Sequence, residues 1–178
     1  MKTMVMMFWC LIFVSGTACS AETAVDTVII SAEQIAANPG ILPHDGFVSS
    51  GQPSAEVLKI FADAGYGTIV DMRMPDEDRG MDEAAVIDGL GMTYITFPIG
   101  SAEDLSFENA AKLDELMSGL EQPVLLHCGS GNRVGALIAL RAKANGASNE
   151  EALAAGEAAG MTRLGKVVRE KLGMEPSK

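Results

Sequence analysis

Apolar residues along this chain follow two spacings, one typical of buried strands and one typical of amphipathic helices. Continuous apolar runs predict short strands at 47–49, 68–72, 93–97 and 124–127. Elsewhere the apolar positions recur every three or four residues, which predicts helices at 54–64, 82–90, 106–120, 134–144, 148–159 and 162–172. A brief helix near 31–38 precedes the first strand.

Capping residues support these boundaries. Ser31 and Ser148 each stand three residues before a Gln or Glu, which is the spacing of a capping box. Gly65 and Gly91 follow helical patterns, as helix-ending glycines do. Because strands alternate with helices, the pattern predicts a single α/β domain with a mainly parallel sheet of four to five strands and helices on both faces. We expect this domain to span residues 29–173, with a short tail at 174–178.

The first 21 residues have the pattern of a secretory signal peptide. Lys2 precedes an apolar stretch from 4 to 14, and small residues follow it. This stretch is too short to cross a bilayer, so we predict an exported protein, periplasmic or secreted, with no integral membrane span and with a flexible lead at 22–28. Lipidation of Cys19 is the alternative, although Gly16 stands where lipoprotein signals usually carry a large aliphatic residue.

Charge and cysteine content narrow the function further. Without residues 1–21 the chain has 12 Lys+Arg against 24 Asp+Glu, a net charge of −12. Such an acidic chain repels nucleic acid, and no basic stripe appears, so nucleic-acid binding is not expected. Cys128 would be the only cysteine left, a buried apolar residue or a free thiol. The two histidines, His44 and His127, are not in metal-ligand spacing, so no metal or other cofactor is predicted.

The segment from His127 to Arg133 carries the clearest chemical pattern. It joins a predicted strand to a predicted helix through Gly129, Ser130, Gly131 and Asn132. Backbone N–H groups of such a loop, the positive helix end and Arg133 would all stabilise a Cys128 thiolate and hold the oxygens of a phosphoryl group. The sequence therefore predicts an anion-binding loop with a nucleophile at its base, braced by His127.

Other segments follow the strands at the same predicted edge of the sheet, where ligands gather in parallel α/β folds. These segments are 51–52, Arg73 and 100–104. We expect them to converge with the loop on one cleft, where Arg73 would supply a second positive charge or else pair with Asp76 or Asp78.

The order His-Cys, glycine-rich loop, Arg resembles the signature of cysteine-dependent protein tyrosine and dual-specificity phosphatases. The segments Ser50-Gly-Gln-Pro-Ser54 and Thr68-Ile-Val-Asp-Met-Arg73 are similar to a bacterial phosphatase-like domain also found fused to beta-lactamase-like hydrolases, a branch that shares a shortened loop. The resemblance covers about residues 45–145. It implies a phosphorylated protein or small molecule as the substrate and a phosphocysteine intermediate on Cys128. It also implies oxygen contacts from Arg133 and an upstream aspartate, Asp104, as general acid, with Glu103 as the next candidate.

Two departures from the signature leave other interpretations open. Only four residues separate Cys128 from Arg133, one fewer than usual, and Val134 stands where phosphatases usually have Ser or Thr. A rhodanese-like sulfurtransferase, with a persulfide on Cys128, would fit a loop of this length. A non-catalytic module that binds phosphate or a protein is the third interpretation.

Overall fold

A five-stranded sheet organises the part of the chain that the computed structural model describes, residues 30–175. Its strands are β1 (Ile41–Pro43), β2 (Phe47–Ser50), β3 (Thr68–Asp71), β4 (Thr93–Thr96) and β5 (Val124–His127). The helices are α1 (Ala32–Ala37), α2 (Ala55–Asp63), α3 (Glu83–Gly89), α4 (Phe107–Ser118), α5 (Asn132–Ala144), α6 (Asn149–Ala158) and α7 (Gly165–Lys171). The predicted signal peptide, Cys19 and the flexible lead lie outside the described residues.

The strands lie in the order β1-β2-β5-β3-β4, and only β1 runs antiparallel to its neighbour. The predicted α/β fold is therefore confirmed. β1 was not predicted, because three residues ending in Pro43 carry little strand pattern and proline is tolerated there only at a sheet edge. β5 is the central strand, and its last residue, His127, pairs with Ser50 of β2 and with Asp71 of β3. Three strands therefore end at one level.

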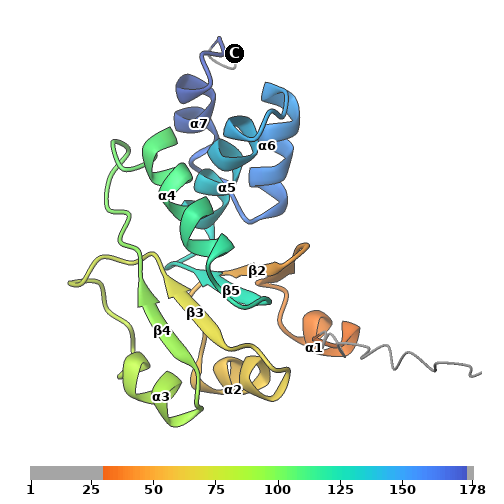
Figure 1. Cartoon of the computed structure of the whole chain (residues 1–178), viewed down its shortest axis with the longest axis vertical. Coiled ribbons are helices and arrows are strands. Elements are labelled where there is room, and N and C mark those ends of the chain that lie inside the picture. The colour runs from red at the N-terminus through yellow and green to blue at the C-terminus, as the bar shows by residue number, and fades with distance from the viewer. Residues whose placement is uncertain (1–29, 176–178) are drawn as a thin grey trace, which may run out of the picture.

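Helices cover both faces of the sheet. α4, α5, α6 and α7 gather on one face, and α2 and α3 lie on the other (Figure 1). Alternation along the strands supplies both cores: Leu126 faces the α5 side, and its neighbour Leu125 faces the α2 side. Both leucines have no exposed surface, so the strand that carries the predicted loop is buried on both sides.

Several helices differ from the sequence prediction, and α5 begins at Asn132 rather than at 134. α7 begins at Gly165 rather than at 162, because the residues before it bind another part of the chain, as described below. α4 begins after its cap Ser106 as predicted, but Phe107 at its first position is 41% exposed and does not contribute to the core. Ala110, Leu113 and Met117 form the buried face of α4 instead.

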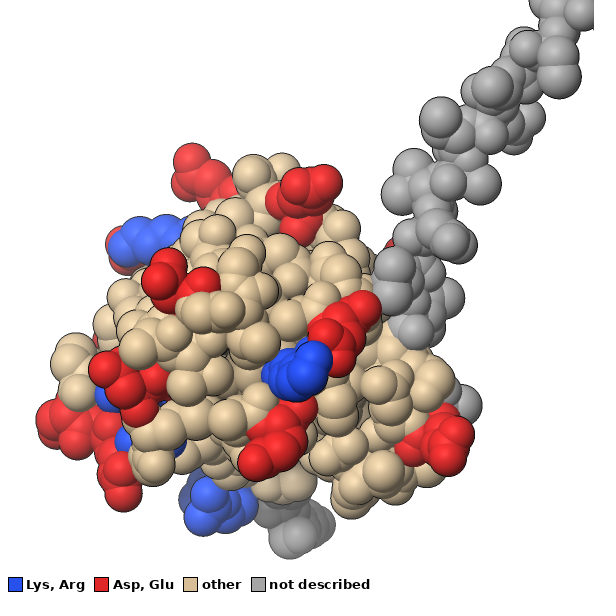
Figure 2. Space-filling view, turned by 90° about the horizontal axis from the view of Figure 1, so that it is seen from below, with Lys and Arg blue, Asp and Glu red and all other residues tan. Residues whose placement is uncertain are grey.

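The described surface is mixed and mainly acidic. Asp and Glu side chains are scattered over the face shown in Figure 2, with a few Lys and Arg side chains between them. Within residues 30–175, no helix combines the length and the apolar character needed to cross a membrane.

Candidate active site

The loop from Cys128 to Arg133 connects the central strand β5 to the first turn of α5. Gly131 adopts a φ of +79°, a left-handed conformation that glycine accepts at little cost, and this turn allows α5 to begin at Asn132. The loop is anchored to the end of β2: the Cys128 amide donates to the Ser50 carbonyl (3.4 Å), and Gly51 pairs with Ser130 in an isolated bridge. Gly51 and Gln52 therefore contact the loop, as the predicted convergence requires, but neither lines the pocket described below.

Cys128 is a free cysteine with no exposed surface, at the base of this loop. It stands four positions before Asn132, the first residue of α5. Val134 is also fully buried and belongs to the apolar core under α5. The residue that replaces the usual Ser or Thr therefore contributes packing rather than a group for the reacting centre.

Arg133 is held at the loop mouth by a carboxylate that the sequence analysis did not single out. Its Nη2 donates to Glu77 Oε2 (2.7 Å) and its Nη1 donates to Glu77 Oε1, so the pair is bidentate. Nη1 also donates to the Ile99 carbonyl (3.0 Å). The hydrogen bonds to Glu77, and to a smaller degree the nearby Cys128, raise the pKa of Arg133. Arg133 is therefore a fixed, permanently charged group next to the candidate nucleophile.

The segment that carries Glu77 follows β3 and is shaped by Arg79. The Arg79 guanidinium donates to the carbonyls of Met74 (3.3 Å) and Glu77 (2.9 Å). The Met74 amide donates in turn to Glu77 Oε1 (2.7 Å). Hydrogen bonds from Arg133 lower the pKa of Glu77, and burial opposes this only in part. Glu77 is therefore an ionised, preorganised partner of Arg133. Residues 76–78 are all acidic, and the sequence alone does not show which of them pairs with the arginine.

Arg73 does not reach the cleft. Its side chain is fully buried and donates from Nε to Asp71 Oδ1 (2.9 Å) and from Nη2 to Glu83 Oε2. The expected contact with a ligand is not supported by this placement, and the alternative pairing with Asp76 or Asp78 is wrong. Because residues two apart in a strand point the same way, Arg73 follows Asp71 to the α3 side of the sheet.

His127 lies in the same buried cluster, beneath the loop. Its Nε2 is 3.1 Å from Glu83 Oε1 and 3.9 Å from Asp71 Oδ1. Burial lowers the pKa of His127 to about 4, against the opposing charge of Asp71, so the ring is neutral at pH 7. Burial raises the pKa of Asp71, but hydrogen bonds from Arg73 and Tyr94 outweigh it and bring that pKa down to about 2. Within the described residues neither ring nitrogen of His127 has a hydrogen-bond partner, so the bracing role predicted for this residue stays a prediction.

The side chains of Asp71, Glu83 and His127 place three metal-ligating atoms within 4.8 Å of one another. The Arg73 guanidinium already binds both carboxylates of this group, however. A second cation there would meet a permanent positive charge at close range, so the cluster is an internal ion network rather than a metal centre.

Asn132 serves as a clamp instead of presenting its amide to a ligand. Its Oδ1 accepts from the amides of Thr162 (2.8 Å), Arg163 (2.8 Å) and Leu164 (3.3 Å), and its Nδ2 donates to Thr162 Oγ1 (2.8 Å). The side chain is thereby committed to the segment between α6 and α7. Only its backbone amide is left for the anion-binding loop, so the sequence prediction of a substrate-binding residue applies to that amide alone.

Asp104 closes its own loop. Its Oδ2 accepts from the amides of Gly100 and Ser101 (2.9 Å each) and from Ser101 Oγ (3.2 Å). These backbone hydrogen bonds lower the pKa of Asp104. Its neighbour Glu103 is exposed, and hydrogen bonding also lowers its pKa. In this arrangement Asp104 shapes the pocket wall, and its role as general acid stays a prediction.

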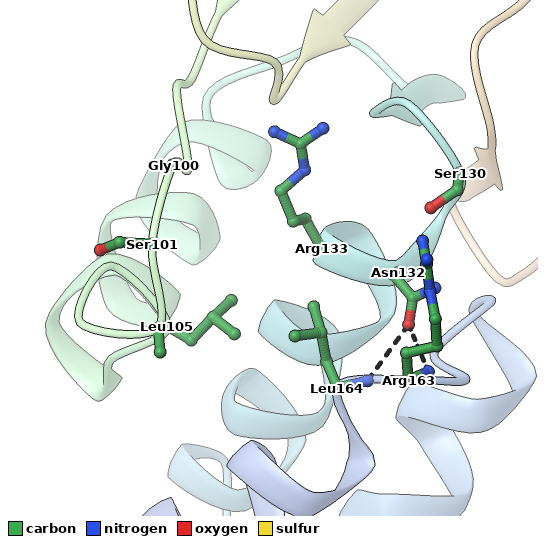
Figure 3. Close-up of a pocket in the computed structure, with 9 residues that line it drawn as sticks. Gly100, Ser101, Leu105, Ser130, Asn132, Arg133, Arg163 and Leu164 are labelled. Carbon is green, nitrogen blue, oxygen red and sulfur yellow. Dashed lines mark hydrogen bonds between the residues drawn. The ribbon is translucent and has the colours of Figure 1, made fainter.

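These segments meet around a pocket of about 460 Å³. Figure 3 shows the loop residues Ser130 and Arg133 on one side and the segment from Gly100 to Leu105 on the other. The predicted convergence with the loop is therefore confirmed for residues 100–102, whereas Glu103 and Asp104 do not line this pocket. The third wall, Arg163 and Leu164, was not predicted, because no sequence pattern links a residue before α7 to a loop thirty positions earlier.

Comparisons with known proteins agree with this architecture. Residues 34–170 match the model of the family described as "DSP-PTPase phosphatase fused to NAD+ Kinase". This is the phosphatase superfamily that the loop signature indicated, although the matching branch is named for NAD+ kinase rather than for a beta-lactamase-like partner. No curated protein sequence matches the chain.

Several solved structures share the fold. A candidate phosphatase from Neisseria meningitidis is 22% identical with a TM-score of 0.63, over 74% of this chain and 98% of that one. Pseudomonas aeruginosa TpbA, solved as a cysteine-to-serine variant in complex with pTyr, is 16% identical with a TM-score of 0.56, over 76% and 85%. The active form of Tk-PTP is 21% identical with a TM-score of 0.54, over 76% and 97%.

Proposed function

Because the chain belongs to the family of DSP-PTPase phosphatases described as fused to NAD+ kinase, we propose that it hydrolyses a phosphate monoester with the Cys128 thiolate as nucleophile. The observation that carries this proposal is the placement of Arg133, bidentately fixed by Glu77 at the mouth of the loop whose base is Cys128. A guanidinium held in this way can bind two oxygens of a phosphoryl group without first losing side-chain freedom.

The reaction proceeds in two displacements. The sulfur of Cys128 attacks phosphorus, the bond from phosphorus to the ester oxygen breaks, and that oxygen leaves with the electron pair and takes up a proton. Water then attacks the phosphocysteine, the S–P bond breaks, and inorganic phosphate leaves as the thiolate is restored. Loop amides, the N-terminal end of α5 and Arg133 stabilise the negative charge that builds up on the equatorial oxygens.

The group that donates the proton to the leaving oxygen can be identified by comparing esters whose leaving groups differ in acidity. Asp104 would have to be protonated to act as general acid, and its hydrogen bonds lower its pKa. If Asp104 is the acid, Asp104→Asn should lower kcat/KM much more for an aryl phosphate with a weakly acidic leaving group than for one with an acidic leaving group. An equal loss with both leaving groups would remove Asp104 from that role.

The main experiment compares the purified protein with its Cys128→Ser variant. We expect the wild type to release phosphate from an aryl phosphate, and the variant to lose that release while it still binds orthophosphate, measured by calorimetry. Thiosulfate with cyanide serves as the competing assay. Thiocyanate formation without phosphate release would overturn the proposal in favour of the sulfurtransferase interpretation.

We also propose that the enzyme acts outside the cytoplasm, since residues 1–21 have the pattern of a cleaved export signal. Expression of the full chain followed by fractionation and mass spectrometry of the amino terminus tests this. A Cys19→Ala variant is the control for lipidation, because a lipid anchor on Cys19 would be lost in it. An uncleaved chain in the cytoplasmic fraction would contradict export.

A further inference from the structure

The pocket beside the catalytic loop has a second arginine, Arg163, which no step of the proposed reaction uses. It lines the same pocket as Arg133 and reaches it from the segment between α6 and α7. We propose, on the basis of the proposed function, that the substrate is a small phosphate ester with a second anionic group, a phosphate or a carboxylate, and that Arg163 binds that group.

The position of Arg163 is built into the fold. The Arg163 amide is one of three that donate to Asn132 Oδ1, and Asn132 is itself part of the catalytic loop. The loop that holds the reacting phosphate therefore also fixes the backbone from which the second guanidinium extends. Figure 3 shows the Arg163 side chain running alongside Asn132 toward Ser130, while Arg133 lies farther toward Gly100.

The charge balance of the pocket points to Arg163 as the group that attracts a second anion. Arg133 is paired bidentately with Glu77, so the two together are close to neutral. Within residues 30–175, the Arg163 side chain makes neither a salt bridge nor a side-chain hydrogen bond, and the residue is exposed. The chain has a formal net charge of −11, so most of its surface charge repels an anion, whereas the unpaired Arg163 guanidinium at the pocket wall attracts one.

The dimensions of the pocket fit a ligand larger than a phosphate group. Its volume of about 460 Å³ lies within the roughly 300–1,000 Å³ of typical small-molecule sites. Leu105 and Leu164 give it an apolar part between the polar walls. A compact organic scaffold can therefore rest on the leucines while its reacting phosphate meets Arg133 and its second anion meets Arg163.

Two aryl phosphates with leaving groups of similar acidity test this assignment, 4-carboxyphenyl phosphate and its uncharged amide analogue, 4-carbamoylphenyl phosphate. The readout is the ratio of their kcat/KM values. We expect the wild type to favour the carboxylate by about twofold to fivefold, the size of one exposed charge-assisted contact. Arg163→Gln should bring the ratio to about one, and Arg163→Lys should keep part of it.

Lys166→Gln is the matched control, since it removes one positive charge from α7 at an exposed position that does not line the pocket. It should keep the wild-type ratio. Arg163→Gln leaves the backbone amide bound to Asn132, so the variant should fold, and circular dichroism verifies this. An unchanged ratio in folded Arg163→Gln, or an equal loss in Lys166→Gln, would overturn the role of Arg163.

A binding measurement separates this inference from the proposed function. In Cys128→Ser, calorimetry compares inorganic pyrophosphate with orthophosphate, with and without Arg163→Gln. A preference for pyrophosphate that disappears in the double variant supports the second anion site even where no ester is hydrolysed. If the wild type hydrolyses both esters but neither the preference nor the ratio depends on Arg163, the phosphatase proposal stands and the second-anion inference fails.

Discussion

Replacement of Asn132 by alanine tests how the loop and its outer wall are joined. The wild-type side chain makes four hydrogen bonds to residues 162–164, three of them at 2.8 Å. A net contribution of roughly 0.5–1.5 kcal/mol for each bond would give about 2–6 kcal/mol in total. Thr162 and Arg163 are exposed, so water replaces part of what is lost. We therefore expect Asn132→Ala to lower the free energy of unfolding by about 2 kcal/mol.

Asn132→Asp is the matched control. A carboxylate keeps the acceptor for the three amides, and the Thr162 hydroxyl can donate to its second oxygen, so we expect a loss below about 1 kcal/mol. The same change should weaken orthophosphate binding, because it puts a negative charge in the anion-binding loop. Urea unfolding followed by far-ultraviolet circular dichroism measures the first effect and calorimetry the second. The reasoning fails if both variants lose equal stability, or if Asn132→Ala loses less than about 0.5 kcal/mol.

Three further changes have definite expected outcomes. Glu77→Gln should lower kcat for an aryl phosphate by about tenfold or more with little change in KM, because the catalytic-loop arginine loses its fixed orientation; a rise in kcat in steady-state kinetics would show that Glu77 blocks the site instead. A Cβ on Gly135 would lie 2.5 Å from a backbone carbonyl of α6, so Gly135→Ala should cost about 2 kcal/mol in urea unfolding, whereas Gly165→Ala, with open space around it, should cost nothing. Between pH 6.5 and about 4 the unfolded chain binds a proton at His127 that the folded chain does not. The melting temperature should therefore decrease as the pH is lowered through this window. Below about pH 4 it should fall further, as the lowered pKa of Asp71 adds its loss; a flat melting temperature from pH 6.5 to 4 would contradict the burial of a neutral His127.

Much of the fold could be predicted because its signals are local. The capping boxes at Ser31 and Ser148 are present as the spacing indicated, and Ser54 caps α2. The central strand β5 was predicted from its apolar run to its last residue. Each of these features depends on residues within a few positions of one another, so hydrophobic periodicity and capping chemistry are sufficient to locate them.

The contacts that finish the site are not local, and for that reason the sequence did not reveal them. Glu77 and Arg133 are 56 positions apart, and Asn132 is 30 positions from Thr162. Residues 76–78 are all acidic, and the one that binds Arg133 is set by the path of this segment. The Arg79 guanidinium fixes that path by donating to the carbonyls of Met74 and Glu77. No periodicity records such a choice, since it depends on the path of the chain in three dimensions.

The prediction that Arg73 reaches the cleft was wrong for a reason that the sequence contains. Arg73 follows β3 at the correct edge of the sheet, but the alternation of side chains along the strand determines to which face its side chain points. Val70 and Met72 face the α5 core, whereas Ile69 belongs to the α2 side. Residues 71 and 73 therefore follow Ile69 away from the catalytic loop. The direction of a side chain from a strand end can be derived from the apolar alternation of the same strand, and here that derivation gives the observed placement.

Because β5 is the central strand, the Cys128 end of the site and the segment 162–164 differ in the free energy needed to open them locally. Cys128 continues a strand that is paired on both sides and has no exposed residue, so its backbone can open only when the whole sheet opens. The Arg163 segment is exposed at residues 162 and 163, and its hydrogen bonds to the loop all run through one side chain, Asn132. In native-state hydrogen exchange the amides of 162–164 should therefore exchange through a low-energy opening, long before those of 124–127. Ligand exchange at the outer wall can then take place on a sheet that keeps the nucleophile in position.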